Sequence, residues 1–226
     1  MDIIHLKYNE ITNYENLCCC IGYFDGLHLG HRQLLEKTLN IGQQEKLKTG
    51  LITFSCDPNQ LIFPHKSFNY LLNEEDRNKI LIDYGFDYLF IIDFDNEILN
   101  LDSDKFVLEY IIKLGIKYLI CGFDFSYGYK GLGKANDLLK YPDFQTIIID
   151  SYNYEQTKVS STYIKQLLKS GDIKLANYLL STNYQLKGVV TNGKKIGRLI
   201  NYPTANLDLS FDYQLPANGV YVTICY

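Results

Sequence analysis

The sequence has 226 residues, of which 22 are Lys or Arg and 26 are Asp or Glu, so its formal net charge is −4. Hydrophobic residues make up 46% of the chain and charged residues 21%. These proportions are typical of globular proteins and exclude a disordered chain, a collagen-like chain and a generally basic nucleic-acid-binding protein.

Short apolar runs alternate with helix-like segments as far as Leu180, and this alternation predicts an α/β fold in which helices cover both faces of a parallel sheet. The predicted strands, in chain order, are residues 17–24, 51–55, 88–94, 118–123 and 146–150, and we expect residues 17–24 to be the first strand. Asn73 and Ser103 are each predicted to cap a helix, and these helices end at Gly85 and Gly115. Ligands of such sheets bind beyond the carboxyl ends of the strands.

The pattern changes after Leu180, where no helical periodicity remains. Residues 184–191 and 219–225 read as strands, and Asn192-Gly193 is typical of a hairpin turn. At about 150 residues per domain the length allows one domain with part of another. We therefore expect a first domain over residues 1–182 and the start of a β domain over residues 183–226.

The segment that carries most chemistry runs from Gly22 to His31, with the sequence GYFDGLHLGH. Glycines at positions 22, 26 and 30 allow close backbone approach to a bound group, and the following helix N-terminus favours phosphate. His28 and His31, three residues apart, can donate hydrogen bonds to phosphate oxygens. From the residues alone, the pair could also be half of a metal site or two structural histidines.

A second segment, residues 159–168, has the sequence VSSTYIKQLL. Ser160 or Ser161 can cap its helix, which Gly171 ends, and capping alone would account for the serines. Alternatively the segment forms a second anion site, in which Ser161, Thr162 and the helix N–H groups face a phosphate and Lys165 supplies charge. Two such helix starts in one α/β domain suggest a nucleoside triphosphate held between them.

These segments resemble those of the bacterial bifunctional riboflavin kinase/FMN adenylyltransferase family. Residues 22–31 resemble its G-x-F-D-G-x-H-x-G-H signature, and residues 159–165 resemble its I-S-S-T-x-I-R element. Thr53-Phe54 with Asp57-Pro58 resembles the family's strand-end loop T-F-x-P-H-P, and residues 122–128 match its segment G-x-D-F-x-F-G. Residues 197–198, 203–207, 215–216 and 219–221 resemble the opening of its riboflavin kinase domain.

The resemblance implies a Rossmann-like nucleotidylyltransferase domain followed by an incomplete β-barrel. It implies the transfer of AMP from ATP to FMN, giving FAD and pyrophosphate with Mg²⁺ and needing no protein nucleophile, since an FMN phosphate oxygen attacks the α-phosphorus of ATP. The implied site residues fall into four groups: the catalytic His28, His31 and Lys165; Gly22, Phe24, Asp25, Gly26, Gly30, Ser161 and Thr162 for ATP; Asp57, Pro58, Asp124, Phe125 and Gly128 for the flavin or nucleotide; and, in the kinase part, Thr204 and Asn206 for nucleotide and Mg²⁺. Core packing is the alternative role of Phe125.

The sequence departs from the family pattern at several positions. Lys165 stands where the family has Arg, which predicts a weaker hold on ATP because lysine lacks a planar bidentate grip. Ser55 and Cys56 occupy the strand-end loop, and Asn201 replaces a glycine of the kinase part. Because the sequence stops at Tyr226, before the acidic residue of the family's kinase site, riboflavin kinase activity is not expected. Two other functions stay open: a nucleotidylyltransferase for another phosphorylated acceptor, and a flavin- or nucleotide-binding protein without catalysis.

The remaining expectations concern location and partners. No apolar run approaches the roughly 18 residues of a membrane helix, and residues 1–14 lack the pattern of a signal peptide. None of the six cysteines forms a C-x-x-C pair, and the neighbouring Cys18, Cys19 and Cys20 should point to alternate faces of a strand. We therefore expect reduced, mostly buried cysteines and a cytoplasmic protein that binds ATP and FMN but neither nucleic acid nor membrane.

Overall fold

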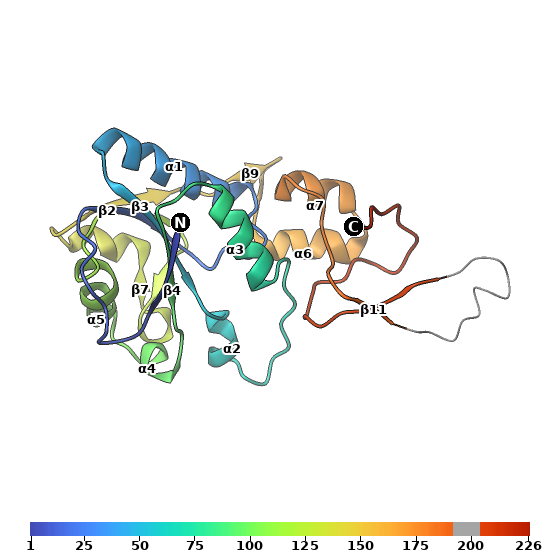
Figure 1. The fold of residues 1–226 in the computed structure, drawn as a ribbon, viewed down its shortest axis with the longest axis horizontal. Coiled ribbons are helices and arrows are strands. Elements are labelled where there is room, and N and C mark those ends of the chain that lie inside the picture. Colours follow the sequence, from blue (N-terminus) through green and yellow to red (C-terminus); the bar gives the residue numbers. More distant parts are fainter. Residues whose placement is uncertain (192–203) are drawn as a thin grey trace.

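The computed structural model describes residues 1–191 and 204–226 (Figure 1). Its centre is a six-stranded sheet in which every neighbouring pair is parallel, in the order β1-β4-β3-β2-β5-β8. The strands are β1 (Asp2–Leu6), β2 (Leu17–Ile21), β3 (Lys48–Phe54), β4 (Tyr88–Ile92), β5 (Ile116–Gly122) and β8 (Gln145–Ile149). The predicted α/β fold with a parallel sheet is confirmed.

The strand β2 lies inside the sheet because all five of its residues are apolar and buried. Its cysteines alternate as expected: Cys19 packs into one core cluster, and Cys18 and Cys20 pack into the cluster on the opposite face. All six cysteines are free, and four of them are buried. Burial raises the pKa of the Cys18 and Cys20 thiols to about 12, so both stay protonated and behave as small apolar groups.

The expectation that residues 17–24 form the first strand is wrong, because β1 precedes them in the chain and pairs with β4 at the sheet edge. An edge strand is half solvated, and Ile3 is 48% exposed. Polar Asp2 and His5 interrupt its apolar residues, so the continuous apolar run that marks a buried strand is missing. The His5 ring lies 2.7 Å from the Asp93 carboxylate just after β4.

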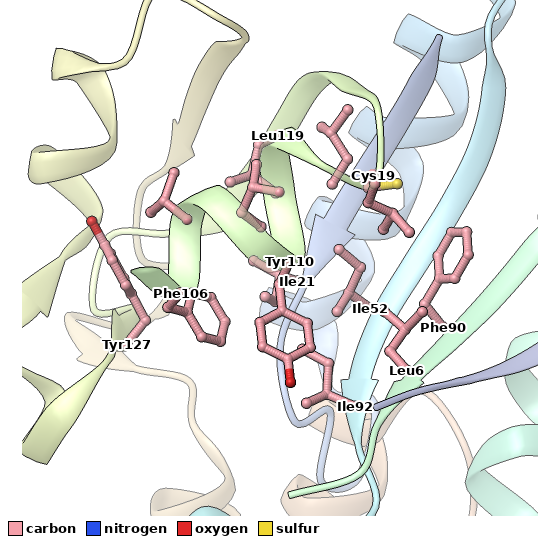
Figure 2. Close-up of a cluster of buried hydrophobic side chains, with 14 of the residues drawn as sticks. Leu6, Cys19, Ile21, Ile52, Phe90, Ile92, Phe106, Tyr110, Leu119 and Tyr127 are labelled. Atoms are coloured by element: carbon pink, nitrogen blue, oxygen red, sulfur yellow. The ribbon is translucent and has the colours of Figure 1, made fainter. Parts of the chain in front are cut away.

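Helices cover both faces of the sheet. On one face, α1 (Leu29–Glu45) and α3 (Glu74–Asp83) pack against a shared core cluster. On the other face, α5 (Ser103–Val107) continues into the π-helical turn η1 (Leu108–Ile112), whose Tyr110 packs against Ile21 and Ile52 of the sheet (Figure 2). Each fully buried large aliphatic side chain of this cluster, such as Ile52, contributes roughly 1.5–3 kcal/mol to stability.

The helix caps agree with the sequence in one case and differ in another. The Asn73 side chain accepts a hydrogen bond from the Asp76 N–H and caps α3 as predicted. The prediction of Ser103 as a cap is wrong: the Asp102 carboxylate accepts from the N–H groups of Asp104 and Lys105, and Ser103 is the first residue of α5. Asp and Ser are comparably good N-caps, so their order in the sequence does not decide between them.

A smaller cluster beyond the sheet is built by α6 (Ser161–Ser170) and α7 (Ile173–Leu180), whose apolar faces pack together and against Leu71. Short elements complete the fold: α2 (Pro58–Ile62), α4 (Asn96–Leu99), β6 (Ser126–Tyr127), the 3₁₀ turn η2 (Tyr129–Gly131), β7 (Gly133–Lys134), the 3₁₀ turn η3 (Ala135–Lys140), β9 (Asn153–Tyr154) and β10 (Thr157–Lys158).

After α7 the chain forms the antiparallel pair β11 (Val189–Thr191) and β12 (Asn206–Asp208). The strand predicted over residues 184–191 is therefore shorter than expected. The strand predicted over residues 219–225 is wrong, because these residues are exposed and pair with no strand among the described residues. Apolar alternation cannot make a strand without a neighbouring strand to complete its hydrogen bonds. The turn predicted at Asn192-Gly193 lies outside the described residues.

Within residues 1–191 and 204–226, no helix combines the length and apolar character needed to cross a membrane.

Candidate active site

A cavity of about 560 Å³ opens at the carboxyl ends of the parallel strands, where the sequence predicts a ligand. Ile21, Phe54, Gly122 and Ile149 line it at the ends of β2, β3, β5 and β8. The first residues of α1 and α6 line it too, so the two predicted anion-binding segments face one space. Its size suits a nucleotide or a flavin, since ligand pockets typically enclose ~300–1,000 Å³.

The two histidines of the first segment form one unit at the start of α1. His28 is the N-cap, and its Nδ1 accepts a hydrogen bond from the His31 N–H at 3.3 Å. The two rings stack with their centroids 3.7 Å apart and their planes within 15°. Because Nδ1 of His28 accepts this bond, the proton of its neutral ring is assigned to Nε2.

Both histidines are neutral at pH 7. Burial lowers the pKa of His28 to about 4 and the pKa of His31 well below its usual range, with the neighbouring His28 adding to the second effect. His31 Nδ1 is buried and has no hydrogen-bond partner among the described residues. A neutral imidazole can donate one hydrogen bond to a bound anion, and because the ring carries no charge, no charged side chain has to be buried beside that anion.

Asp25 and Lys165 form an ion pair between the two segments. Lys165 Nζ lies 2.6 Å from Asp25 Oδ2, and the Leu71 N–H donates to Oδ1 at 2.8 Å. Burial raises the pKa of Asp25, and the Lys165 ammonium and the Leu71 N–H oppose that effect. The Lys165 ammonium also lies 5.4 Å from the centroid of the Tyr70 ring, a cation–π contact.

The start of α6 settles which serine is the cap. Ser160 Oγ accepts from the Tyr163 N–H at 3.1 Å, whereas Ser161 Oγ donates to the Asp25 carbonyl at 2.8 Å. Ser161 therefore joins the α6 N-terminus to the first motif. Thr162, the second residue of α6, lines the cavity. The first backbone N–H groups of an α-helix have no hydrogen-bond partner inside that helix, so those at the start of α6 can bind a ligand.

The residues predicted for the flavin side also line the cavity, but several have a structural task there. The Asp57 carboxylate caps α2 by accepting from the Asn59 N–H at 2.9 Å, and Pro58 begins that helix. Asp124 Oδ2 pairs with Lys158 Nζ at 2.6 Å. Phe125 stacks on Tyr127 and packs against the core, so it both lines the cavity and serves the packing role considered as its alternative.

Of the glycines and Phe24 expected to bind ATP, Gly22, Phe24 and Gly30 line the cavity and Gly26 does not. Gly26 has φ +82°, and a Cβ there would lie 2.7 Å from Leu71, so the turn and the packing against Leu71 require glycine at this position. Thr204 and Asn206, which are expected to bind nucleotide and Mg²⁺ in a kinase part, are exposed and do not line this cavity.

The sequence reasoning missed several residues around the cavity. Lys158 lines it with its ammonium 4.4 Å from the centroid of the Phe123 ring, and its place just before the second segment was the available signal. Arg77 is 3% exposed and donates to the carbonyls of Tyr23 and Phe54. Nothing in the local sequence marks Tyr70 or Arg77 as neighbours of the site.

Comparison with known proteins identifies the family of the chain. The sequence profile of FAD synthetase matches residues 10–163, which include both segments at the cavity. The chain belongs to the FAD synthetase family. The profile of riboflavin kinase matches residues 180–226.

Relatives in this family are enzymes and match nearly the whole chain. The bifunctional riboflavin kinase/FMN adenylyltransferase of Listeria monocytogenes is 36% identical over 228 residues, which cover 98% of this chain and 72% of that protein. The Bacillus subtilis protein of the same name is 33% identical over 204 residues, covering 89% of this chain and 65% of that protein. A crystal structure described as a macrolide-efflux protein from Streptococcus pneumoniae has a TM-score of 0.86 and 32% identity, and it covers 96% of this chain and 73% of its own.

Proposed function

We propose that the chain is an FMN adenylyltransferase, which transfers AMP from ATP to FMN and releases pyrophosphate. One observation carries the proposal: in a member of the FAD synthetase family, the His28–His31 unit, the α6 N-terminus and Lys165 meet on one cavity at the sheet's carboxyl edge. The cavity thus gathers neutral donors, helix N–H groups and a cation, which together suit a triphosphate.

The reaction needs positioning more than it needs covalent chemistry. An oxygen of the FMN phosphate forms a bond to the α-phosphorus of ATP while the bond from that phosphorus to the β-phosphate oxygen breaks, and pyrophosphate leaves with the electron pair. His28 and His31 hydrogen-bond phosphate oxygens through their ring N–H groups, and Lys165 balances the charge that builds on the leaving group. Such preorganised donors act most strongly where water is excluded.

Mg²⁺ fits this site as a companion of ATP and not as a resident ion. Among the described residues, no group of three His, Cys, Asp or Glu side chains is arranged to hold a metal. Mg²⁺ is commonly held by substrate phosphates with one or two carboxylates and water. Asp124 and Asp150, which line the cavity, are the carboxylates available to it, because both oxygens of Asp25 already have partners, whereas Asp124 uses only Oδ2 for its ion pair with Lys158. When bound with ATP, Mg²⁺ supplies neutralising charge for the phosphates.

The flavin is assigned to the side of the cavity formed by Asp57, Pro58, Asp124, Phe125 and Gly128. We assign the adenylyltransferase part to residues 1–182 and the riboflavin kinase part to residues 183–226, with Thr204 and Asn206 as its nucleotide and Mg²⁺ residues. The two family profiles, which match residues 10–163 and 180–226, support this division.

Incubation of the chain with FMN, ATP and Mg²⁺ tests the proposal, with FAD and pyrophosphate measured separately. We expect the two products in equal amounts and no product when EDTA removes Mg²⁺. Lys165→Met should lower turnover at least about tenfold, as expected for loss of a charge at the transferring phosphates. Lys169→Met, in the same helix but exposed, is the matched control and should leave turnover unchanged.

Other outcomes would point to the two alternatives. Binding of FMN and ATP without product would favour a flavin- or nucleotide-binding protein. Pyrophosphate release with a different phosphorylated acceptor, and none with FMN, would favour another nucleotidylyltransferase.

A further inference from the structure

A short segment near the C-terminus is bound to the loop that holds the Asp25–Lys165 pair. The Tyr70 N–H donates to the Asp212 carbonyl at 2.8 Å, and the Gln214 N–H donates to the Tyr70 carbonyl at 2.8 Å. These two bonds form a parallel β-bridge between Tyr70 and Tyr213. We call residues 211–214 the strap. It lies beside the chain between α2 and α3, far from it in sequence (Figure 1).

Side chains reinforce the bridge. The amide of Asn69 donates to the Tyr213 carbonyl at 3.2 Å, and the amide of Asn73 donates to the Tyr213 hydroxyl at 2.5 Å. The Phe211 ring lies against both Tyr70 and Tyr213, with centroid distances of 5.6 Å and 4.8 Å. Tyr213 is 4% exposed and Tyr70 is 3% exposed, so water does not compete for these contacts.

Tyr70, which forms the bridge, and Leu71, which follows it, both contact the Asp25–Lys165 ion pair. The Tyr70 ring faces the Lys165 ammonium, and the Leu71 N–H binds the Asp25 carboxylate that Lys165 also binds. The strap fixes both the N–H and the carbonyl of Tyr70, so it restricts the backbone on either side of that residue. A shift of this backbone would move the partner of the ammonium and the partner of the carboxylate together.

We propose that the strap positions Lys165 and Asp25 for the adenylyl transfer, so that a segment matched by the riboflavin kinase profile helps to set the adenylyltransferase site. Tyr213 is then a positioning residue that acts through Tyr70 and Leu71. This inference rests on the proposed function, because the pair matters only if the cavity binds ATP.

A double-mutant cycle between Tyr213→Ala and Lys165→Met tests the proposal on the full chain. We expect Tyr213→Ala to lower kcat/KM for ATP about tenfold in the wild-type background and less than about twofold in the Lys165→Met background, since coupled residues give non-additive effects. The same cycle is repeated on the dissociation constant of ATP measured by calorimetry, so it does not depend on residual turnover. Tyr213→Phe keeps the ring and the bridge and should restore values near those of wild type.

Tyr221→Ala is the matched control, because Tyr221 lies in the same C-terminal stretch and its hydroxyl donates to Ala217, away from Tyr70. It should change neither constant. If Tyr213 merely supported folding, Tyr213→Ala would lower activity and the fraction of protein that binds ATP by the same factor in both backgrounds, and that result would overturn the inference. A wild-type chain that binds ATP but makes no FAD would instead refute the proposed function, and the binding cycle would still decide the role of the strap.

Discussion

At the scale of the residue, Lys165 is held by its surroundings more firmly than a surface lysine. It is 24% exposed at the side chain, and its ammonium lies between the Asp25 carboxylate and the Tyr70 ring. A phosphate that recruits this ammonium must compete with Asp25. Restricting the lysine in advance reduces the side-chain entropy lost on binding, while the competition with Asp25 lowers the affinity gained.

We predict that Lys165→Arg strengthens the binding of ATP by a few-fold and raises turnover. A guanidinium can keep one N–H on Asp25 and present a second to phosphate, which a single ammonium does less well. Apparent ATP affinity and kcat, measured at saturating FMN, check the prediction. Unchanged values would mean that lysine serves this site as well as the family's arginine.

We predict that burial of neutral His28 makes the fold sensitive to acid. The folded-state pKa is about 4 and the unfolded value is near 6.5, so between these values the unfolded chain binds more protons and stability falls as the pH falls. His28 alone should remove roughly 3 kcal/mol of the free energy of unfolding between pH 7 and pH 4.

Urea unfolding of His28→Asn at the two pH values isolates this contribution. Asparagine can still cap α1 but does not titrate, so the variant should lose roughly 3 kcal/mol less than wild type over the same interval. Groups away from the histidine pair, including Asp25, titrate in both proteins and cancel in the comparison, whereas the pKa of His31, which His28 helps to lower, rises when His28 is replaced. Identical losses in the two proteins would refute the neutral, buried state of His28.

At the scale of the element, the turn between β2 and α1 depends on Gly26. We predict that Gly26→Ala destabilises the protein more than Gly85→Ala does. Both glycines have a positive φ, +82° and +84°, so both variants incur a left-handed backbone cost of about 1–2 kcal/mol. A Cβ at Gly85 meets nothing within 4 Å, whereas one at Gly26 would lie 2.7 Å from Leu71, and such overpacking typically costs ~1–3 kcal/mol more.

Chemical unfolding of the two variants measures this difference directly. Because Leu71 also binds Asp25, Gly26→Ala should weaken ATP binding as well, while Gly85→Ala should not. Equal destabilisation of the two variants would show that Leu71 can move away without cost.

At the scale of the whole molecule, order is unevenly distributed. We predict that backbone amides of β2 and β3 exchange most slowly with deuterium, and that those of residues 219–226 exchange within about tenfold of the unstructured rate, because opening free energy follows burial and pairing. Val220, Val222 and Tyr226 are fully exposed. Mass spectrometry of peptic peptides provides the measurement. Strong protection in residues 219–225 would instead support the strand that the sequence alone predicts there.

Much of the central domain could be predicted from sequence because its signals are local. Five of the six sheet strands are short apolar runs, and the Gly-rich segment with His28 and His31 carries its own turn and helix start. The pairing of His28 with His31 follows from their spacing of three residues. The stacking of the rings and their neutral state required knowledge of the burial, which no local pattern gives.

The parts that could not be predicted depend on contacts between distant residues. Asn69 and Tyr213 are hydrogen-bonded although they are 144 residues apart in the sequence. The sequence around neither residue indicates which residue it contacts. Strand β1 pairs with β4 at the edge of the sheet, where Asp2, Ile3 and His5 are exposed and only Leu6 is buried, so its apolar pattern is weak. Residues 219–225 show the reverse case, in which a good local strand pattern has no pairing strand in the described part of the chain.

The parallel direction of β1 has a practical consequence for experiments on this protein. Because β1 runs parallel to the other strands, Met1 lies at the amino edge of the sheet and the cavity lies at the opposite, carboxyl edge. An affinity handle, a fluorescent dye or a surface linker joined to Met1 therefore points away from the cavity mouth. Immobilisation through Met1 leaves the cavity open to solution. Attachment through the last residues would instead place the support next to residues 215–226, which follow the strap directly.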